Sequence, residues 1–205
     1  MAEHELVIRN GIVVDGTGDE RFVGDVAVSD GVITHVGGSG RGRVDGRGHR
    51  EIDADGHLVA PGFVDIHTHY DGQATWDPVL DPSASHGVTT VVAGNCGVGF
   101  APVRPGQENW LVELMEGVED IPGTALHEGI QWEWESFPEY LETLSATPTA
   151  CDFAVLLPHV PLRVYTMGDR CDAAPTQADL DAMRRLVGEA MAVKAAGLAQ
   201  KLGQL

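Results

Sequence analysis

Short apolar runs, each ending at or near a glycine-containing pair, occupy the first sixty residues of the chain. These pairs are Asn10-Gly11, Asp15-Gly16 and Asp30-Gly31. Asn-Gly and Asp-Gly supply the positive φ angles that two-residue hairpin turns need. The pattern therefore predicts a small antiparallel β unit over residues 1–60, as part of a β-sandwich, with a mobile Gly- and Arg-rich loop at 37–48.

From residue 61 onward, apolar runs alternate with helical periodicity. Short runs that suit buried strands cover 63–67, 88–93 and 153–157. Apolar residues at helical spacing predict amphipathic helices over 108–118, 137–144 and 176–191, the last with Thr176 as its N-cap. Strands that alternate with helices imply a parallel sheet with crossover connections, so residues 61–205 are predicted to be an α/β unit.

Composition excludes several classes of function. The chain of 205 residues has room for one ordinary domain, or for a small domain and part of a larger one. It contains no stretch near the ~20 apolar residues of a membrane span, and its first residues lack the apolar segment of a signal peptide. A formal net charge of −18 argues against binding nucleic acid or an anionic membrane.

Cysteine usage bears on the compartment. The chain has three cysteines, Cys96, Cys151 and Cys171, an odd and sparse set that makes no disulfide framework. Such a set is typical of a reducing environment, and we therefore predict a cytoplasmic protein.

His67 and His69 are the sharpest candidates for chemistry. In a strand, residues i and i+2 point to the same side, so two imidazoles separated by one residue can close on one metal ion. The alternative is a pair of solvent-facing histidines on an edge strand. The apolar run before His67, together with Asp65 two positions earlier, favours the metal.

Cys96 follows the second predicted strand, in the sequence GNCG. It therefore belongs at the same kind of strand end as the two histidines. A thiolate is a strong ligand for Zn²⁺, whereas the alternative is a small buried thiol. Position alone favours neither, but the flanking glycines permit a close approach of the backbone and so indicate a site.

Several motifs together resemble the amidohydrolase superfamily and, within it, the D-aminoacylase (N-acyl-D-amino-acid deacylase) branch. The matching stretches are VIRNGIVVDGTG, APGFVDIHTHYDG, HGVTTVVAGNCGVGFAPVRP and LMEGVEDIPG. GNCG after the second strand is the feature that singles out this branch, because a cysteine there replaces the bridging modified lysine of hydantoinase-like relatives.

The resemblance implies a fold, a cofactor and a reaction. The fold would be a TIM-like (β/α)₈ barrel preceded by the β unit. His67 and His69 would be the first metal pair, and Cys96 the thiolate that holds or bridges to a zinc ion. Asp65 and Asp71 would support these ligands. Zinc would activate water and polarise the amide of a small N-acyl amino acid, releasing a carboxylic acid and a D-amino acid.

Three further residues are candidates for supporting the site or lining the pocket. Asn95 precedes the cysteine in GNCG. His159 follows the third strand, where it suits a pocket wall or a structural role. Arg163 could bind a substrate carboxylate or form a surface ion pair, and the sequence favours neither role.

The chain also departs from the family. A (β/α)₈ barrel takes ~250 residues, whereas residues 61–205 amount to roughly half of that. The family's two further metal histidines belong on middle barrel strands, and no histidine follows His159. Its general-base aspartate belongs on the last barrel strand and has no counterpart either. After Met191 no strand pattern occurs, and both lysines fall there. We therefore expect a prematurely ended chain of at best weak activity.

Two alternatives remain at the level of sequence. One is a non-catalytic remnant or assembly partner, which the missing second half of the site favours. The other is a cyclic-amide hydrolase of the hydantoinase type, against which Cys96 weighs. The sequence leaves the oligomeric state open.

Overall fold

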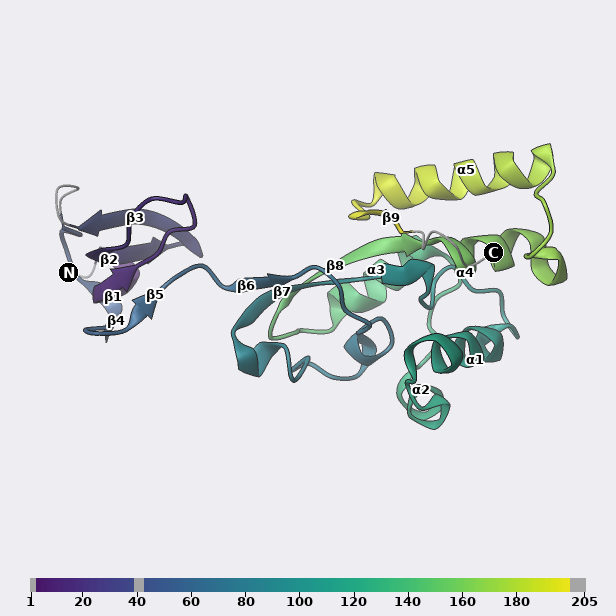
Figure 1. Ribbon diagram of the computed structural model, residues 1–205, viewed down its shortest axis with the longest axis horizontal. Helices are drawn as coiled ribbons and strands as arrows, with labels where there is room; N and C mark the ends of the chain where they lie inside the picture. Colours follow the sequence, from purple (N-terminus) through teal and green to yellow (C-terminus); the bar gives the residue numbers. More distant parts are fainter. Residues whose placement is uncertain (1–2, 39–42, 200–205) are drawn as a thin grey trace. The chain divides into compact units, whose positions relative to one another are not determined.

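The computed structural model describes residues 3–38 and 43–199 (Figure 1). The chain divides into two compact units, the first ending at Pro61 and the second beginning at Gly62. Within the described residues, no helix is long and apolar enough to cross a membrane.

The first unit is a five-stranded mixed sheet. Its strands are β1 (His4–Val13), β2 (Phe22–Ser29), β3 (Val32–Gly38), β4 (Gly48–Asp53) and β5 (Leu58–Val59). The order is β3-β2-β1-β4, and β5 also pairs with β1. The β1–β2 and β2–β3 pairs are antiparallel, but β4 and β5 lie parallel to β1. The prediction of an antiparallel unit is therefore correct only for the first three strands.

The predicted turn at Asn10-Gly11 is wrong. β1 runs through this pair without reversing, and its register against β2 shifts between Ile8 and Gly11. Asn10 has a φ of 59° and donates its amide to the Asp25 carboxylate at 2.9 Å. The positive φ thus makes a β-bulge, in which an extra residue bends the strand. By contrast, Asp30 and Gly31 form the predicted turn between β2 and β3, with φ angles of 52° and 70°.

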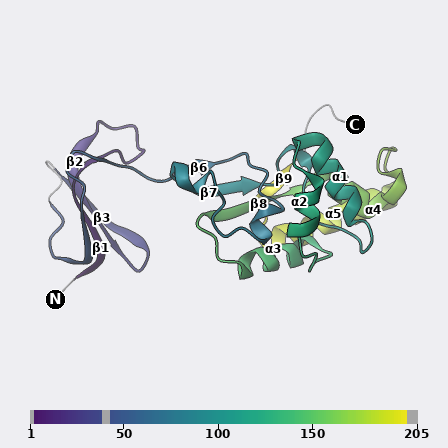
Figure 2. The same ribbon diagram turned by 90° about the horizontal axis from the view of Figure 1, so that it is seen from below.

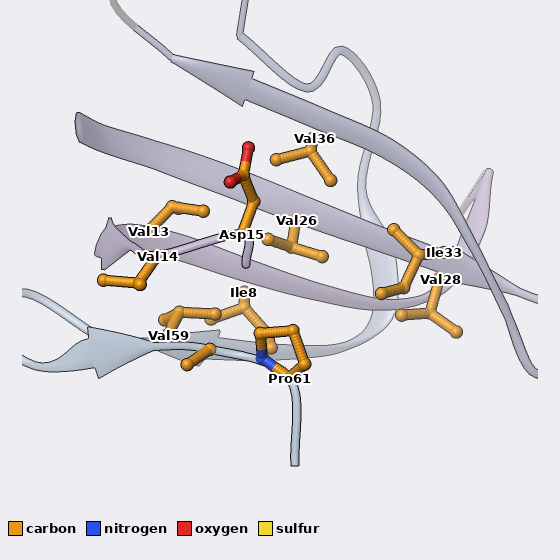
Figure 3. A pocket seen from close by; sticks show the side chains of 11 residues that line it. Ile8, Val13, Val14, Asp15, Val26, Val28, Ile33, Val36, Val59 and Pro61 are labelled. Carbon is orange, nitrogen blue, oxygen red and sulfur yellow. The ribbon is translucent and has the colours of Figure 1, made fainter. Parts of the chain in front are cut away.

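One face of this sheet is apolar and hollowed (Figure 3). The side chains that line the hollow are mostly branched aliphatic groups, including Ile8, Val13, Val26, Val28, Ile33, Val36 and Val59. The predicted mobile loop, 37–48, overlaps the last two residues of β3 and the first of β4, and its residues 39–42 are outside the described part of the chain.

The second unit is built on a parallel sheet. Its strands, in the spatial order β6-β7-β8-β9, are β6 (Phe63–Asp65), β7 (Val88–Ala93), β8 (Asp152–Pro158) and β9 (Gly197–Ala199). All three neighbouring pairs are parallel, and Figure 2 shows β6, β7 and β8 running side by side. β7 begins and ends where the sequence predicted a strand, at 88 and 93, whereas β6 is shorter than the predicted 63–67.

Helices connect these strands. They are α1 (Glu108–Glu119), α2 (Gly123–Gly129), α3 (Phe137–Ala146), α4 (His159–Met167) and α5 (Gln177–Ala192). The three predicted helices correspond to α1, α3 and α5. Ser136 and Thr176 begin α3 and α5 as capping boxes, each with an acidic residue three positions later. Alternation of strands and helices confirms the α/β class of this unit.

The sequence pattern did not predict two features of this unit. The short helices α2 and α4 were not predicted, and the expectation that no strand follows Met191 is wrong. β9 pairs with β8, with Leu156 opposite Gly197 and Pro158 opposite Ala199. The strand has three residues and therefore shows no period of its own, so only its pairing with β8 identifies it.

The core of the second unit fixes the loops at the carboxyl ends of the strands. Trp134 and Tyr140 are buried, and their rings lie 5.0 Å apart. The indole of Trp134 donates to the carbonyl of Phe100 at 2.8 Å, and the hydroxyl of Tyr140 donates to the carbonyl of Asp71 at 2.7 Å. Both carbonyls belong to loops that follow strands, so aromatic packing holds these loops in place.

Candidate metal centre

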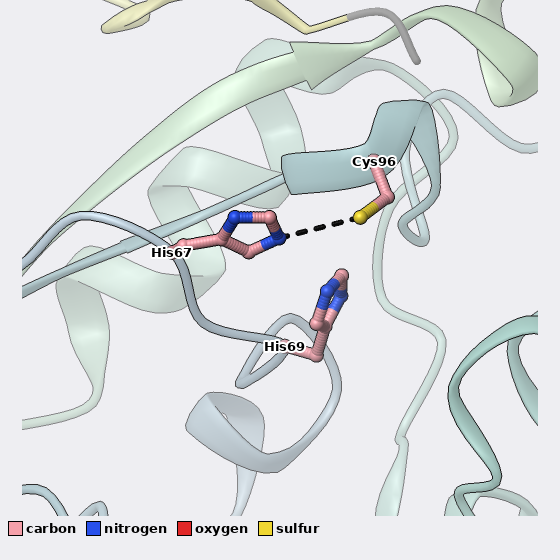
Figure 4. A group of neighbouring side chains, drawn as sticks. All are labelled: His67, His69 and Cys96. Atoms are coloured by element: carbon pink, nitrogen blue, oxygen red, sulfur yellow. Dashed lines mark hydrogen bonds between the residues drawn. The ribbon is translucent and has the colours of Figure 1, made fainter. Parts of the chain in front are cut away.

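His67, His69 and Cys96 converge at the carboxyl end of the sheet (Figure 4). The histidines follow β6, and the cysteine lies in the 3₁₀ turn Asn95–Gly97 after β7. One potential ligand atom from each residue lies within 4.8 Å of the others. Nε2 of His67 is 3.3 Å from Sγ of Cys96, and the two imidazole centroids are 5.5 Å apart. We call these residues the His-His-Cys cluster.

Backbone conformation places Cys96 in this cluster. Gly94, Cys96 and Gly97 all have positive φ, at 80°, 55° and 75°. A Cβ at Gly94 would lie 2.0 Å from the carbonyl oxygen of Leu156, so only glycine fits against β8. The glycines that suggested a site in the sequence therefore allow the close approach and sharp turn that bring the thiol toward the histidines.

Hydrogen bonds anchor the histidine segment to its neighbours. Thr68, between the two histidines, donates both its amide and its hydroxyl to the carbonyl of Val92 on β7, at 3.0 and 2.9 Å. Asp65 accepts from the amide of His67 at 3.3 Å and from the hydroxyl of Ser83 at 3.4 Å. Asp65 thus shapes the turn after β6, as expected of a supporting residue.

Asp71 lies beneath His69 and is fully buried. Its Oδ1 accepts from the amide of Gly94 at 2.7 Å, and its Oδ2 is 4.0 Å from Nδ1 of His69. Burial raises the pKa of Asp71 to about 7, against the opposing effect of its backbone hydrogen bonds. No hydrogen-bond partner of Oδ2 is found among the described residues. A buried carboxylate with a vacant oxygen beside histidine is the arrangement that orients a metal ligand.

Glu119 is a neighbour of the cluster that sequence reasoning missed. Its Oε2 lies 3.2 Å from Nε2 of His69. The residue ends α1, within the motif LMEGVEDIPG, but nothing in the spacing of that motif relates it to a histidine fifty positions earlier. Only the packing of α1 brings the two together.

The other candidates lie outside the His-His-Cys cluster. Asn95 donates its side-chain amide to the carbonyl of Val92 at 2.8 Å and so braces the turn. His159 begins α4 half-buried, and burial lowers its pKa. Arg163 is buried and donates to the carbonyls of Cys171 and Ala173, so its observed partners are backbone groups rather than acidic side chains.

A family model described as "Amidohydrolase family" matches residues 50–203. The chain belongs to the amidohydrolase family. Its sequence is 36% identical to a D-aminoacylase of Alcaligenes xylosoxydans over 194 residues, which are 95% of this chain. It is also 35% identical to an N-acyl-D-aspartate deacylase of the same organism over 96% of the chain.

Solved amidohydrolase structures show the same similarity. An N-acyl-D-glutamate deacylase from Bordetella bronchiseptica, complexed with zinc and a phosphonate inhibitor, superposes with a TM-score of 0.78 at 34% identity, covering 96% of this chain. A D-aminoacylase structure gives a TM-score of 0.75 at 33% identity. The chain spans 38% of each of these structures and 37% of the D-aminoacylase sequence, so the similarity concerns little more than a third of such an amidohydrolase.

The residues of this amidohydrolase fit a divalent metal. Two imidazoles and a thiol are the donors that zinc prefers. Thr68, Tyr70 and other residues line an adjacent cavity of about 280 Å³, on which both histidines open. Asp71 and Glu119 add acidic groups on two sides of His69. The donors are therefore accessible, close together and in negatively charged surroundings.

Proposed function

We propose that this chain carries the first half of the metal centre of a zinc-dependent amidohydrolase that removes the acyl group from N-acyl-D-amino acids. The observation that carries the proposal is the His-His-Cys cluster, whose potential ligand atoms all lie within 4.8 Å of one another. Its donors come from the carboxyl ends of neighbouring parallel strands, where barrel enzymes build their active sites. The parallel sheet would then be the first part of a TIM-like barrel.

His67, His69 and Cys96 would hold the ion. When bound, zinc would lower the pKa of a water molecule toward neutrality and polarise the substrate carbonyl. Asp71 would orient His69 through Nδ1, and Asp65 would set the backbone turn from which His67 projects. The thiolate would contribute a negative charge that lowers the net charge of the ion and its ligands.

The substrate class is supported by the relatives. One similar structure contains zinc and a phosphonate mimic of a tetrahedral intermediate, in an N-acyl-D-glutamate deacylase. Another is of a D-aminoacylase whose binuclear centre is described as activated by one metal and attenuated by the second. A small N-acyl amino acid is consistent with an open cavity of about 280 Å³ and with an acidic chain unsuited to nucleic acid. We also propose a cytoplasmic location, which the odd and sparse set of three cysteines supports.

The 205-residue chain by itself would have at best weak activity. The histidines and the general-base aspartate that complete the centre in the family have no counterpart in these residues. Three protein donors still suffice to bind zinc with an open position. Metal binding and catalysis therefore separate in this chain, and they can be measured separately.

Metal analysis of the purified chain tests the proposal. We expect close to one zinc per chain after dialysis against zinc-containing buffer, and loss of most of it in His67→Asn and Cys96→Ala. His127→Asn, an exposed histidine on α2, is the matched control and should retain the metal. An assay with N-acetyl-D- and N-acetyl-L-amino acids should show weak, D-selective hydrolysis that depends on zinc.

Two outcomes would contradict the proposal. A chain that binds no zinc, or binds it equally in all three variants, would show that the cluster is not a metal site and would favour a non-catalytic remnant. Zinc-dependent hydrolysis of cyclic amides in preference to N-acyl-D-amino acids would assign the other branch of the superfamily.

A further inference from the structure

Glu119 reaches the His-His-Cys cluster from a distant part of the sequence. It is the last residue of α1, and its Oε2 lies 3.2 Å from Nε2 of His69. The side chains of Glu119 and His69 are 20% and 17% exposed, so the contact is largely shielded from solvent. Asp71 lies on the other ring nitrogen, with Oδ2 4.0 Å from Nδ1. The imidazole of His69 is thus placed between two carboxyl groups.

The two carboxyl groups are not equivalent. Histidines that bind a metal through one nitrogen usually donate the other N–H to a carboxylate or carbonyl that fixes the ring. Asp71 suits this orienting position, because it is fully buried and held by the amide of Gly94. Nε2 is then the nitrogen that faces the ion, and Glu119 lies on the metal side of the ring.

Two separations match those between ligands of one ion, although Glu119 stands outside the group of three whose ligand atoms all lie within 4.8 Å of one another. With the usual zinc bond lengths and a tetrahedral angle, nitrogen and oxygen ligands lie about 3.4 Å apart, and nitrogen and sulfur ligands about 3.6 Å apart. The observed separations are 3.2 Å for His69 and Glu119 and 3.3 Å for His67 and Cys96. Glu119 contacts the cluster at His69. Rotation about its side-chain bonds can bring the carboxylate to an ion bound by Nε2 of that histidine.

The negative charge at this position favours a bound cation. A carboxylate at the carboxyl end of a helix meets the negative end of the helix dipole, which is unfavourable. A second acidic group, Asp71, lies on the other side of the same His69 ring. Among the side chains that the structure describes, His69 is the only basic group that pairs with either carboxylate within 4.0 Å. A divalent ion would relieve both unfavourable interactions.

We propose that Glu119 is a further ligand of the metal centre, supplying a carboxylate oxygen to the ion that His67, His69 and Cys96 hold. The proposal rests on the proposed metal-binding function. It adds a donor from α1 to a set drawn otherwise from the ends of two strands. The donor set would then be two nitrogens, one sulfur and one oxygen.

Cobalt substitution of the full 205-residue chain tests the role of Glu119. Co²⁺ reports its ligands by visible absorption, and a thiolate ligand adds a charge-transfer band. The variants are Glu119→Gln, which keeps the shape and removes the charge, and Glu113→Gln, an exposed residue of α1 that makes the same change of charge. We expect Glu119→Gln to weaken Co²⁺ and Zn²⁺ binding at least about tenfold and to alter the visible bands at saturation. Glu113→Gln should change neither.

Thermal melting without metal separates ligation from folding. Because the carboxylate of Glu119 lies in unfavourable surroundings, metal-free Glu119→Gln should melt at or above the wild-type temperature. A lower melting temperature in the absence of metal would overturn the proposal in favour of a structural role. Weaker affinity with unchanged bands at saturation would overturn direct ligation, because a positioning residue leaves the donor set intact.

The same titrations distinguish this proposal from the one on which it rests. If wild-type protein binds Co²⁺ with a thiolate band and Glu119→Gln binds it equally well, Glu119 is not a ligand and the His-His-Cys cluster stands. If wild-type protein shows no thiolate band and no tight binding, both proposals fail.

Discussion

The carboxylate of Asp71 accepts a hydrogen bond of 2.7 Å from the backbone amide of Gly94. This bond joins the loop that carries His69 to the turn that carries Cys96. Both groups are buried, so the bond is shielded from solvent. The donors of two different strands are therefore held in register by one side chain beneath them, and the predictions below begin with it.

Asp71→Ala should destabilise the second unit by about 2 kcal/mol, because it leaves the Gly94 amide buried without its acceptor. Asp71→Asn keeps an acceptor oxygen and should cost less. Urea unfolding followed by tryptophan fluorescence reports this unit selectively, since all four tryptophans follow Gly62. Glu142→Ala, on the exposed face of α3, is the control. Equal losses in the two Asp71 variants would show that packing, rather than this bond, stabilises the loops.

Tyr140→Phe should lower the free energy of unfolding by about 1–3 kcal/mol. The hydroxyl of Tyr140 donates to the carbonyl of Asp71 at 2.7 Å in a fully buried position, so its removal leaves that carbonyl unsatisfied. Tyr165→Phe is the matched control, because its hydroxyl bonds the exposed Glu135. Urea midpoints of the two variants compare the losses, and a larger effect at Tyr165 would contradict the assignment.

Zinc should raise the melting temperature of the wild-type chain. A ligand that binds only the folded state at a hundred times its dissociation constant stabilises by about 2.7 kcal/mol. Differential scanning fluorimetry with and without a chelator measures the shift. His67→Asn should abolish it, whereas His127→Asn should keep it. A shift that persists in His67→Asn would place the binding elsewhere.

The capping box of α3 should contribute stability that depends on pH. The amides of Ser136 and Glu135 hold the pKa of Glu139 below its usual 4.5. A carboxyl group with a lowered pKa stabilises the fold above about pH 4.5, and the contribution disappears as the pH falls through the lowered pKa. The difference in unfolding free energy between wild type and Glu139→Gln should therefore be largest near neutrality. A difference that grew on acidification would contradict this assignment.

The hydroxyl group of Ser136 is the other partner in the capping box of α3, and its contribution to stability can be measured by removing it. Ser136→Ala should cost about 1 kcal/mol, because the Ser136 hydroxyl accepts the otherwise unpaired amide of Glu139 at 3.3 Å. Ser145→Ala, near the end of the same helix, should be close to neutral, since its hydroxyl bonds a helical carbonyl and alanine favours the helix. Urea unfolding near neutral pH measures both.

The sequence predicts elements whose signal is local. β7 agrees with its β-branched run at both ends, and α5 begins where Thr176 and Asp179 form a capping box. Such signals lie within a few residues and need no knowledge of the partner. His67 and His69 are also expected to lie near each other, but the strand period on which that expectation rests does not reach them, because β6 ends at Asp65 and the loop after it brings the two rings together.

Three of the failures depend on partners distant in sequence. Whether Asn10-Gly11 turns or bulges depends on Asp25, which captures the Asn10 amide from β2. β9 exists because β8 has an edge to pair with. Glu119 meets His69 only through the packing of α1. In each case the local sequence permits several conformations, and a contact made elsewhere selects one.

The His-His-Cys cluster lies entirely within one strand–connection–strand unit, from Phe63 on β6 to Cys96 after β7. The connection between β6 and β7 is shorter than the one between β7 and β8, so less entropy is lost in closing it. During synthesis the amino-terminal part of a chain is available first. The nascent polypeptide could thus gather these three donors, and meet a metal ion, before α3, α5 or β9 has been translated.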